Sequence, residues 1–336
     1  MQPRPLILGR TPIAKPIIQA PIGSLASTAL VAAVSNAGGV GALALTWVDA
    51  AAARRLVSAV RARTSAPFIA NFVLSFSPSS LPAALEAGAP VVTFSWGLPG
   101  VALATVHSFG AVAGVQVGTL EGAKRALDEG CDFLICQGVE AGGHVQSSLP
   151  LALLLQEVIA AAGDTPVVAA GGLADGADIA ATIAAGASGV MLGTRFVASA
   201  ESAAHSSYKA ALLSAASGDT VLTGCFDGGW PYALHRVLRN TTLTEWESAG
   251  CPPVGRRPGE GDTVARLESG QPVRRYEDAP PSAAMQGDVL ACCLYAGTGV
   301  GKITAIREAG ELVGELWREA QSVLAAGAPP AARAEN

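Results

Sequence analysis

The sequence is poor in charged and aromatic residues: 15% of its 336 residues are Asp, Glu, Lys or Arg, and 5% are Phe, Trp or Tyr. Half of the chain is nevertheless hydrophobic, so the apolar mass is mainly Ala, Val and Leu, as in helices packed on a buried parallel sheet. This composition excludes a disordered chain. The formal charge of −5 and the lack of a basic segment argue against nucleic acid as a partner.

Metal-binding patterns and targeting signals are also missing. The six cysteines include no CxxC pair and no histidine at ligand spacing, so we predict reduced thiols and no metal site. The N-terminus has no continuous apolar run of the signal-peptide kind, and we expect a cytoplasmic protein. Residues 21–48 carry no charge, but the segment SNAGG divides them into a helix and a strand, so no membrane partner is expected.

One unit recurs along the chain: a helical stretch ends in glycine, and a short β-branched run follows a few residues later. The joints are SNAGGVGALAL, LEAGAPVVTFS, HSFGAVAGVQV, LDEGCDFLICQ and IAAGASGVMLG. Glycine at such a joint suits the left-handed position that closes a helix. We therefore predict helices such as 49–63 and 119–128, and eight strands at residues 16–20, 39–45, 68–74, 91–95, 111–117, 133–137, 166–170 and 190–193.

Eight alternating strand and helix units are typical of a (β/α)8 TIM barrel, whereas a doubly wound open sheet usually has fewer. We predict an α/β fold with this barrel over residues 1–217. Residues 218–290 collect Gly, Pro, Trp and charge clusters, which favours an irregular lid or small insertion. In it, Trp230, Pro231 and Tyr232 are expected to be exposed, at a substrate entrance or a subunit contact. Residues 291–336 are predicted to form a glycine-rich loop, a helix and a tail.

Two glycine-rich loops follow the last two predicted strands. In TIM barrels the active site lies at the carboxyl ends of the strands, and the loops after strands seven and eight commonly bind phosphate. Gly171 and Gly172 follow strand seven, where Asp175 is placed to cap the next helix. Gly193 and Thr194 end strand eight and offer backbone N–H groups and a hydroxyl to an anion. Either loop alone could be a simple tight turn, but both together indicate a phosphate site.

Amide and apolar residues surround the same end of the predicted barrel. Pro21 and Ile22 follow the first strand, Asn71 lies in the third, and Gln137 ends the sixth. An isoalloxazine ring needs hydrogen-bond partners along its polar edge and an apolar bed. The phosphate loops suit a sugar phosphate or FMN, and these amides favour FMN. The alternative role for both amides is ordinary loop anchoring.

The segment QGVEAGGH ends in a histidine at the predicted barrel rim. Gly142 and Gly143 allow the backbone to approach a flat or anionic group closely. His144 follows them, and a histidine can take a proton from carbon or hold a hydrogen bond to an oxygen. We predict that His144 is catalytic, with a structural histidine at the rim as the alternative. Surface or packing roles are predicted for the other three histidines, His107, His205 and His235.

Together, the motifs QAPIG, NFVL, QGVEAGGH, VVAAGGLADG, MLGTRF and YAGTGVG resemble the nitronate monooxygenase family, formerly called 2-nitropropane dioxygenases, over roughly residues 10–310. The resemblance implies a TIM barrel that holds FMN and oxidises alkyl nitronates with O2 through a flavin semiquinone. It also implies that His144 is the active-site histidine. By motif position, the implied FMN contacts are Asn71, Gln137, Gly142, Gly172 and the segment Met191, Leu192, Gly193 and Thr194.

A nitronate is already an anion, so its oxidation needs no base, whereas a neutral nitroalkane needs one. We therefore expect His144 to matter chiefly for nitroalkanes. Arg195 and Lys302 are candidates for positive charge near the phosphate and the flavin, with a structural ion pair as the alternative for each. The expected partners are a small-molecule substrate and O2, with a homodimer as one option for the assembly.

Two alternatives remain open from the sequence. The first alternative is a nicotinamide-dependent reductase. A related FMN barrel, the flavin-dependent enoyl-acyl-carrier-protein reductase, shares the strand-six motif and the AGG phosphate loop, and a quinone reductase belongs to the same alternative. The second is a barrel without flavin, either a phosphosugar isomerase or a binding module.

Overall fold

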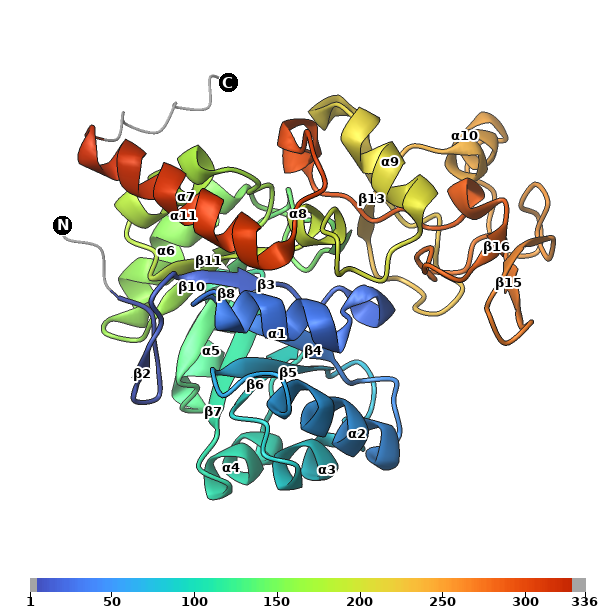
Figure 1. The fold of residues 1–336 in the computed structure, drawn as a ribbon. Helices are drawn as coiled ribbons and strands as arrows, with labels where there is room; N and C mark the ends of the chain where they lie inside the picture. The colour runs from blue at the N-terminus through green and yellow to red at the C-terminus, as the bar shows by residue number, and fades with distance from the viewer. Residues whose placement is uncertain (1–4, 328–336) are drawn as a thin grey trace.

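Eight parallel strands form one sheet in the computed structural model, which describes residues 5–327 (Figure 1). Their order in the sheet follows the chain: the last strand pairs with the first, and a bridge between Ile18 and Val40 joins the first strand to the start of the second. The predicted TIM barrel is therefore confirmed. The strands are β3 (Ile17–Gln19), β4 (Gly41–Ala44), β5 (Phe68–Val73), β6 (Val91–Ser95), β7 (Val112–Val117), β8 (Phe133–Gln137), β10 (Val167–Ala170) and β11 (Gly189–Leu192).

Helices connect these strands and begin at the polar residues that the sequence offers as caps. The side chains of Ser27, Asp49 and Thr119 each accept a backbone N–H in the first turn of a helix. Asp175 and Asp178 form a reciprocal capping box, as expected for Asp175. The helices are η1 (Gly23–Leu25), α1 (Thr28–Asn36), α2 (Ala50–Arg61), α3 (Leu81–Glu86), α4 (Val101–Ser108), α5 (Leu120–Asp128), α6 (Leu151–Ala162), α7 (Gly176–Ala184) and α8 (Thr194–Val197).

The glycine joints have the conformation that the sequence pattern predicts. At each of the five predicted joints a barrel helix is followed by a glycine with a positive φ, which an L-residue with a side chain rarely adopts. These glycines are Gly38 (91°), Gly88 (88°), Gly110 (71°), Gly130 (86°) and Gly186 (107°). Because each turn sends the chain back into the sheet, these glycines determine where the next strand begins.

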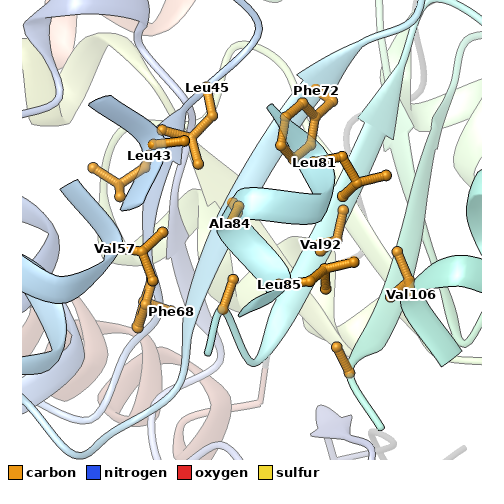
Figure 2. Packing of buried hydrophobic residues seen from close by; sticks show 14 of the residues in the cluster. Leu43, Leu45, Val57, Phe68, Phe72, Leu81, Ala84, Leu85, Val92 and Val106 are labelled. Atoms are coloured by element: carbon orange, nitrogen blue, oxygen red, sulfur yellow. The ribbon is translucent and has the colours of Figure 1, made fainter. Parts of the chain in front are cut away.

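The hydrophobic core consists of a barrel interior and a surrounding layer between strands and helices. The interior includes Ile69, Phe133 and Val168, and Leu6 and Leu8 reach it from a short N-terminal hairpin. That hairpin pairs β1 (Ile7–Leu8) with β2 (Thr11–Pro12). Figure 2 shows part of the outer layer, where side chains of β4 to β6 pack against those of α2 to α4: Leu43, Phe68 and Val92 against Val57, Leu85 and Val106.

Residues 218–290 contain more regular structure than the predicted irregular lid. Two small sheets, β12-β13-β9 and β15-β14-β16, are built from strands of two to four residues. Such strands are too short to give a clear alternation, which is why the sequence did not reveal them. The elements are β9 (Gly143–His144), η2 (Ser217–Asp219), β12 (Thr220–Thr223), β13 (His235–Leu238), α10 (Thr241–Ser248), β14 (Thr263–Arg266), β15 (Pro272–Arg274) and β16 (Gln286–Gly287).

The C-terminal part returns to the barrel. In Figure 1, α11 (Ala309–Ala325) lies along α7, and its side chains share a hydrophobic cluster with those of α1 and α7. The remaining elements are α9 (Ser206–Ser214), η3 (Val289–Ala291) and η4 (Thr298–Lys302). The predicted tail at residues 329–336 lies outside the described residues. Between residues 5 and 327 no helix is long and apolar enough to cross a membrane.

Candidate active site

A cavity of about 720 Å³ opens where the barrel strands end. Every strand of the barrel contributes a residue at or near its carboxyl end, or just after it: Ala20, Ala44, Asn71, Ser95, Gln116, Gln137, Ala170 and Met191. A cavity therefore lies at the end of the barrel where the sequence led us to expect the site.

The structure brings the predicted site residues together with one exception. Leu192 is buried in the layer between the sheet and the helices, because successive side chains of a strand point to opposite faces and Met191 points inward. The residues that line the cavity as predicted are Pro21, Ile22, Asn71, Gln137, Gly142, Gly143, His144, Gly171, Gly172, Met191, Gly193 and Thr194.

We call Gly171, Gly172, Gly193 and Thr194 the glycine end of the cavity. Gly171 and Gly172 have φ values of 124° and 70°. A Cβ atom on Gly172 would lie 2.8 Å from the hydroxyl oxygen of Thr298, so this loop is packed tightly from outside. A Cβ on Gly193 would meet only Ala20 and Ile22, at 3.7 and 4.0 Å. The two loops follow neighbouring strands, β10 and β11, and both line the cavity.

No lysine or arginine of the described chain lines the cavity. Arg195 is buried, and its guanidinium donates to the carbonyl oxygens of Ala198 and Ala305. Lys302 pairs with Asp178 at 2.5 Å and with Asp175 at 3.2 Å. Neither candidate therefore places its charge at the cavity, and an anion at the glycine end would be held by neutral donors.

The predicted amides are both held by protein contacts. The Asn71 nitrogen donates to the Thr93 hydroxyl at 3.0 Å, which leaves the Asn71 oxygen available to the cavity. The Gln137 oxygen accepts the backbone N–H of Gln146 at 2.8 Å, and its nitrogen donates to the His144 carbonyl at 3.1 Å. Gln137 thus anchors the loop that carries His144. Its second amide hydrogen and second lone pair are still available to a ligand.

Gln116 also lines the cavity and was missed by the sequence analysis. Its side-chain nitrogen donates to the side-chain oxygen of Gln146 at 2.7 Å. A polar residue inside the apolar strand VAGVQV was a visible signal, since a buried amide requires a partner.

His144 lies on β9, directly opposite His235 of β13. Its Nε2 atom is buried and has no hydrogen-bond partner among the described residues. The His144 ring lies 4.3 Å from the Trp230 ring, centroid to centroid, and 5.5 Å from that of Tyr295. Burial and the neighbouring His235 lower the pKa of His144 to about 3. The imidazole is therefore neutral at pH 7.

His235 is fully buried and holds a fixed tautomer. Its Nδ1 donates to the Ala233 carbonyl at 3.0 Å, and its Nε2 accepts the backbone N–H of Phe226 at 3.1 Å. The predicted packing role fits these contacts. Its position beside His144 was not visible in the sequence, because it depends on pairing between strands about 90 residues apart. Of the other histidines, His205 caps α9 and His107 pairs with Asp132 at the surface.

An aromatic wall forms the other side of the cavity. We call Trp47, Phe76, Trp96, Trp230 and Tyr295 the aromatic end, since all of them line the cavity. Successive rings are in edge-to-face contact, with centroids 5.4, 5.3 and 4.7 Å apart from Trp47 to Phe76, Trp230 and Trp96. Trp96 has a φ of 59°, a conformation that a bulky residue adopts only when its surroundings determine it.

Of this wall only Trp230 was singled out from the sequence, and it was expected to be exposed at a substrate entrance or a subunit contact. Trp230 is buried, while Tyr232 is fully exposed as predicted. Three of the five tryptophans of the chain line one cavity, although nothing local in their sequence context distinguishes them from the other two.

Comparison with known proteins gives consistent matches. The family model described as nitronate monooxygenase matches residues 4–83 and 79–319. A nitronate monooxygenase of Pseudomonas aeruginosa is 32% identical over 327 residues, which cover 83% of this chain and 92% of that protein. A Mycobacterium tuberculosis protein named as an octahydro-indene-carboxyl-CoA dehydrogenase is also 32% identical, over 71% of this chain and 69% of its own length.

Two solved structures are similar over nearly the whole chain. FabK from Thermotoga maritima has a TM-score of 0.78 at 28% identity and covers 94% of this chain and 95% of its own. A nitroalkane oxidase from Streptomyces ansochromogenes has a TM-score of 0.76 at 28% identity, and the match covers 94% of this chain and 98% of that one.

Proposed function

The chain belongs to the nitronate monooxygenase family, and from this premise we propose that it oxidises alkyl nitronates with O2, using FMN bound in the barrel cavity. Membership makes the protein a flavin-dependent oxidoreductase; the identity of the flavin and of the substrate is our proposal. The observation that carries it is a single cavity with glycine loops at one end and an unpartnered, neutral histidine at the other.

The residues at the glycine end fit the phosphate of FMN. Gly193 leaves open the space that its own side chain would fill, and the first backbone N–H groups of α8 have no acceptor within that helix. The Thr194 hydroxyl oxygen accepts the Gly297 N–H at 3.0 Å, so the hydroxyl hydrogen can be donated to a ligand. Without a cation nearby, these neutral donors would hold the phosphate. Asn71, with its free oxygen, would contact the ring.

Bound flavin supplies the electron acceptor for the substrate and the route to O2. The side chains of the aromatic end exclude water from the reacting carbon. His144 has two possible uses. As a neutral imidazole it carries one unprotonated nitrogen, which can accept the proton that leaves the carbon of a neutral nitroalkane, and one N–H group, which can donate a hydrogen bond to a nitronate oxygen.

The test is anaerobic mixing of the purified yellow protein with ethylnitronate, NADH and NADPH in separate experiments, followed by oxygen-electrode measurements in air. We expect ethylnitronate to bleach the flavin absorbance and to drive oxygen uptake, and we expect neither nicotinamide to do so. A protein that is bleached by NADPH and not by ethylnitronate would refute the proposal.

A reductase is the second candidate, because the overall fold is as similar to FabK as to the nitroalkane oxidase. The same experiment separates the two, since a reductase must accept electrons from a nicotinamide before it reduces its substrate.

A further inference from the structure

We propose that the aromatic end of the cavity takes nitronates with a bulky, uncharged, apolar group, and that Asp278 makes the site select against nitronates that carry a carboxylate. This inference rests on the proposed nitronate oxidation and adds the substrate class to it.

The cavity extends beyond the residues that fit the flavin. All the predicted flavin contacts belong to the barrel and its loops, whereas further lining residues come from the 218–290 region. These are mostly apolar: Trp230, Leu267, Ala279, Pro280 and Met285. The space between this region and the barrel mouth therefore offers a substrate apolar surface on both sides, and burial of apolar area is what would stabilise it there.

Ring-shaped groups suit this space particularly well. The wall from Trp47 to Trp96 presents both faces and edges of its rings, because neighbouring rings are inclined at 61° to 73° to one another. A phenyl group can add to such a wall by stacking or by an edge-to-face contact, each of which stabilises more than area burial alone.

The charges along the cavity disfavour substrates with a negatively charged tail. Among the described residues that line the cavity, no lysine, arginine or glutamate occurs, and Asp278 is the one aspartate. Asp278 lies beside Trp230: a Cβ atom built on Gly229 would lie only 2.2 Å from the Asp278 Oδ1 atom. Its carbonyl oxygen accepts the Tyr295 hydroxyl at 2.9 Å, and the Tyr295 ring is the neighbour of His144.

A substrate carboxylate in this space would be stripped of water, would find no cation, and would meet the Asp278 carboxyl group. Burial raises the pKa of that carboxyl, which shows that the surroundings already disfavour one negative charge. A second negative charge is disfavoured for the same reason. An uncharged tail avoids both costs.

The test uses three nitronates that share the same reacting head and differ only in the tail: those of 3-nitropropionate, 3-methyl-1-nitrobutane and 2-phenylnitroethane. Their tails are a carboxylate, an isopropyl group with the same number of heavy atoms, and a phenyl ring. A CH2 group separates each tail from the reacting carbon. From oxygen uptake we expect kcat/KM to be highest for the phenyl compound, and about 100-fold lower for the carboxylate than for the isopropyl compound, as for other like-charge contacts.

The Asp278→Asn variant removes the negative charge from the cavity, and Glu277→Gln makes the same chemical change at the adjacent residue, which does not line it. We expect Asp278→Asn to raise kcat/KM for the carboxylated nitronate about tenfold while the isopropyl value stays within about two-fold. Glu277→Gln should change neither.

The inference is overturned if the wild-type enzyme prefers the carboxylated nitronate to its isopropyl counterpart. It is also overturned if Asp278→Asn changes kcat/KM for the two nitronates by the same factor, because Asp278 would then have a structural role. If none of the three nitronates drives oxygen uptake, the proposed nitronate oxidation itself is contradicted instead.

Discussion

The two ends of the cavity are built in different ways. The glycine end consists of short motifs that directly follow neighbouring strands, and its shape depends on residues without side chains. The aromatic end is assembled from large side chains that follow β4, β5 and β6 and from two distant segments, at Trp230 and Tyr295. Local turn chemistry therefore creates one end, and long-range packing creates the other.

This difference has a functional meaning in the proposed enzyme. A phosphate needs backbone donors and room, which glycine turns provide. Chemistry at a carbon atom needs a dry surface and a neutral proton acceptor, which Trp230 and His144 provide together. If the division is correct, changes at one end should alter flavin binding, and changes at the other should alter substrate kinetics.

The largest effect is expected for Gly193→Val, which places methyl groups in the proposed phosphate space. Loss of two hydrogen bonds to a charged group, each worth about 1.5–3 kcal/mol, should weaken FMN binding about 100-fold or more. Riboflavin has no phosphate and should lose much less affinity. Fluorescence titration of the flavin-free protein measures both.

Gly218→Val is the matched control, because Gly218 lies outside the cavity and a Cβ there meets no atom within 4 Å. Equal losses of affinity for FMN and riboflavin in Gly193→Val would show that the phosphate is not at the glycine end.

His144→Asn should separate the two substrate classes. We expect kcat/KM for nitroethane to fall about 100-fold or more, as for loss of a general base, while the value for ethylnitronate falls less than about tenfold. FMN affinity should be unchanged. Oxygen uptake with each substrate gives the values, and equal losses on both would refute the division between base and binding roles.

The pH dependence of stability tests the burial of His144. With a pKa of about 3 when folded and 6.5 when unfolded, His144 binds a proton in the unfolded chain at pH 5 and not in the folded one. The free energy of unfolding should therefore fall as the pH decreases below about 6.5, by about 2 kcal/mol at pH 5 relative to pH 8. Burial also lowers the pKa of His235, which acts in the same direction.

Urea unfolding of the flavin-free protein at pH 5 and pH 8 measures this change. The His144→Asn variant should lose that part of the pH dependence, and an identical dependence in both proteins would mean that the ring is not buried as neutral imidazole.

The smallest effect is expected for Lys302→Met. Lys302 is partly exposed and pairs with Asp175 and Asp178 at the start of α7, so its loss should cost less than about 1 kcal/mol of stability. FMN affinity should stay within about two-fold. Thermal unfolding and flavin titration check these values. A clear loss of FMN affinity at unchanged stability would move Lys302 to the phosphate.

The barrel could be predicted from the sequence because its signals are local. Gly38, Gly88 and Gly130 mark helix ends that a single position encodes, and the strands that follow are continuous apolar runs. The glycine end could be predicted for the same reason. Leu192 was the exception, because the site was assigned as a segment and strand alternation was not applied to it.

The aromatic end could not be predicted in this way. Trp230 reaches the cavity only because β13 pairs with β9, and strands of two and four residues leave no reliable pattern. The same pairing places His235 beside His144, and that neighbour contributes to the lowered pKa of His144. The roles of Lys302 and Arg195 stayed open because a charged residue next to a motif carries no information about where its side chain points.

A crystal structure of the FMN complex tests the account most directly. We predict the phosphate within hydrogen-bond distance of backbone N–H groups at Gly172, Gly193 or Thr194, with the isoalloxazine ring extending towards Asn71 and His144. A phosphate bound elsewhere, or an isoalloxazine ring that faces away from His144, would contradict the division of the cavity into a flavin-holding end and a substrate end.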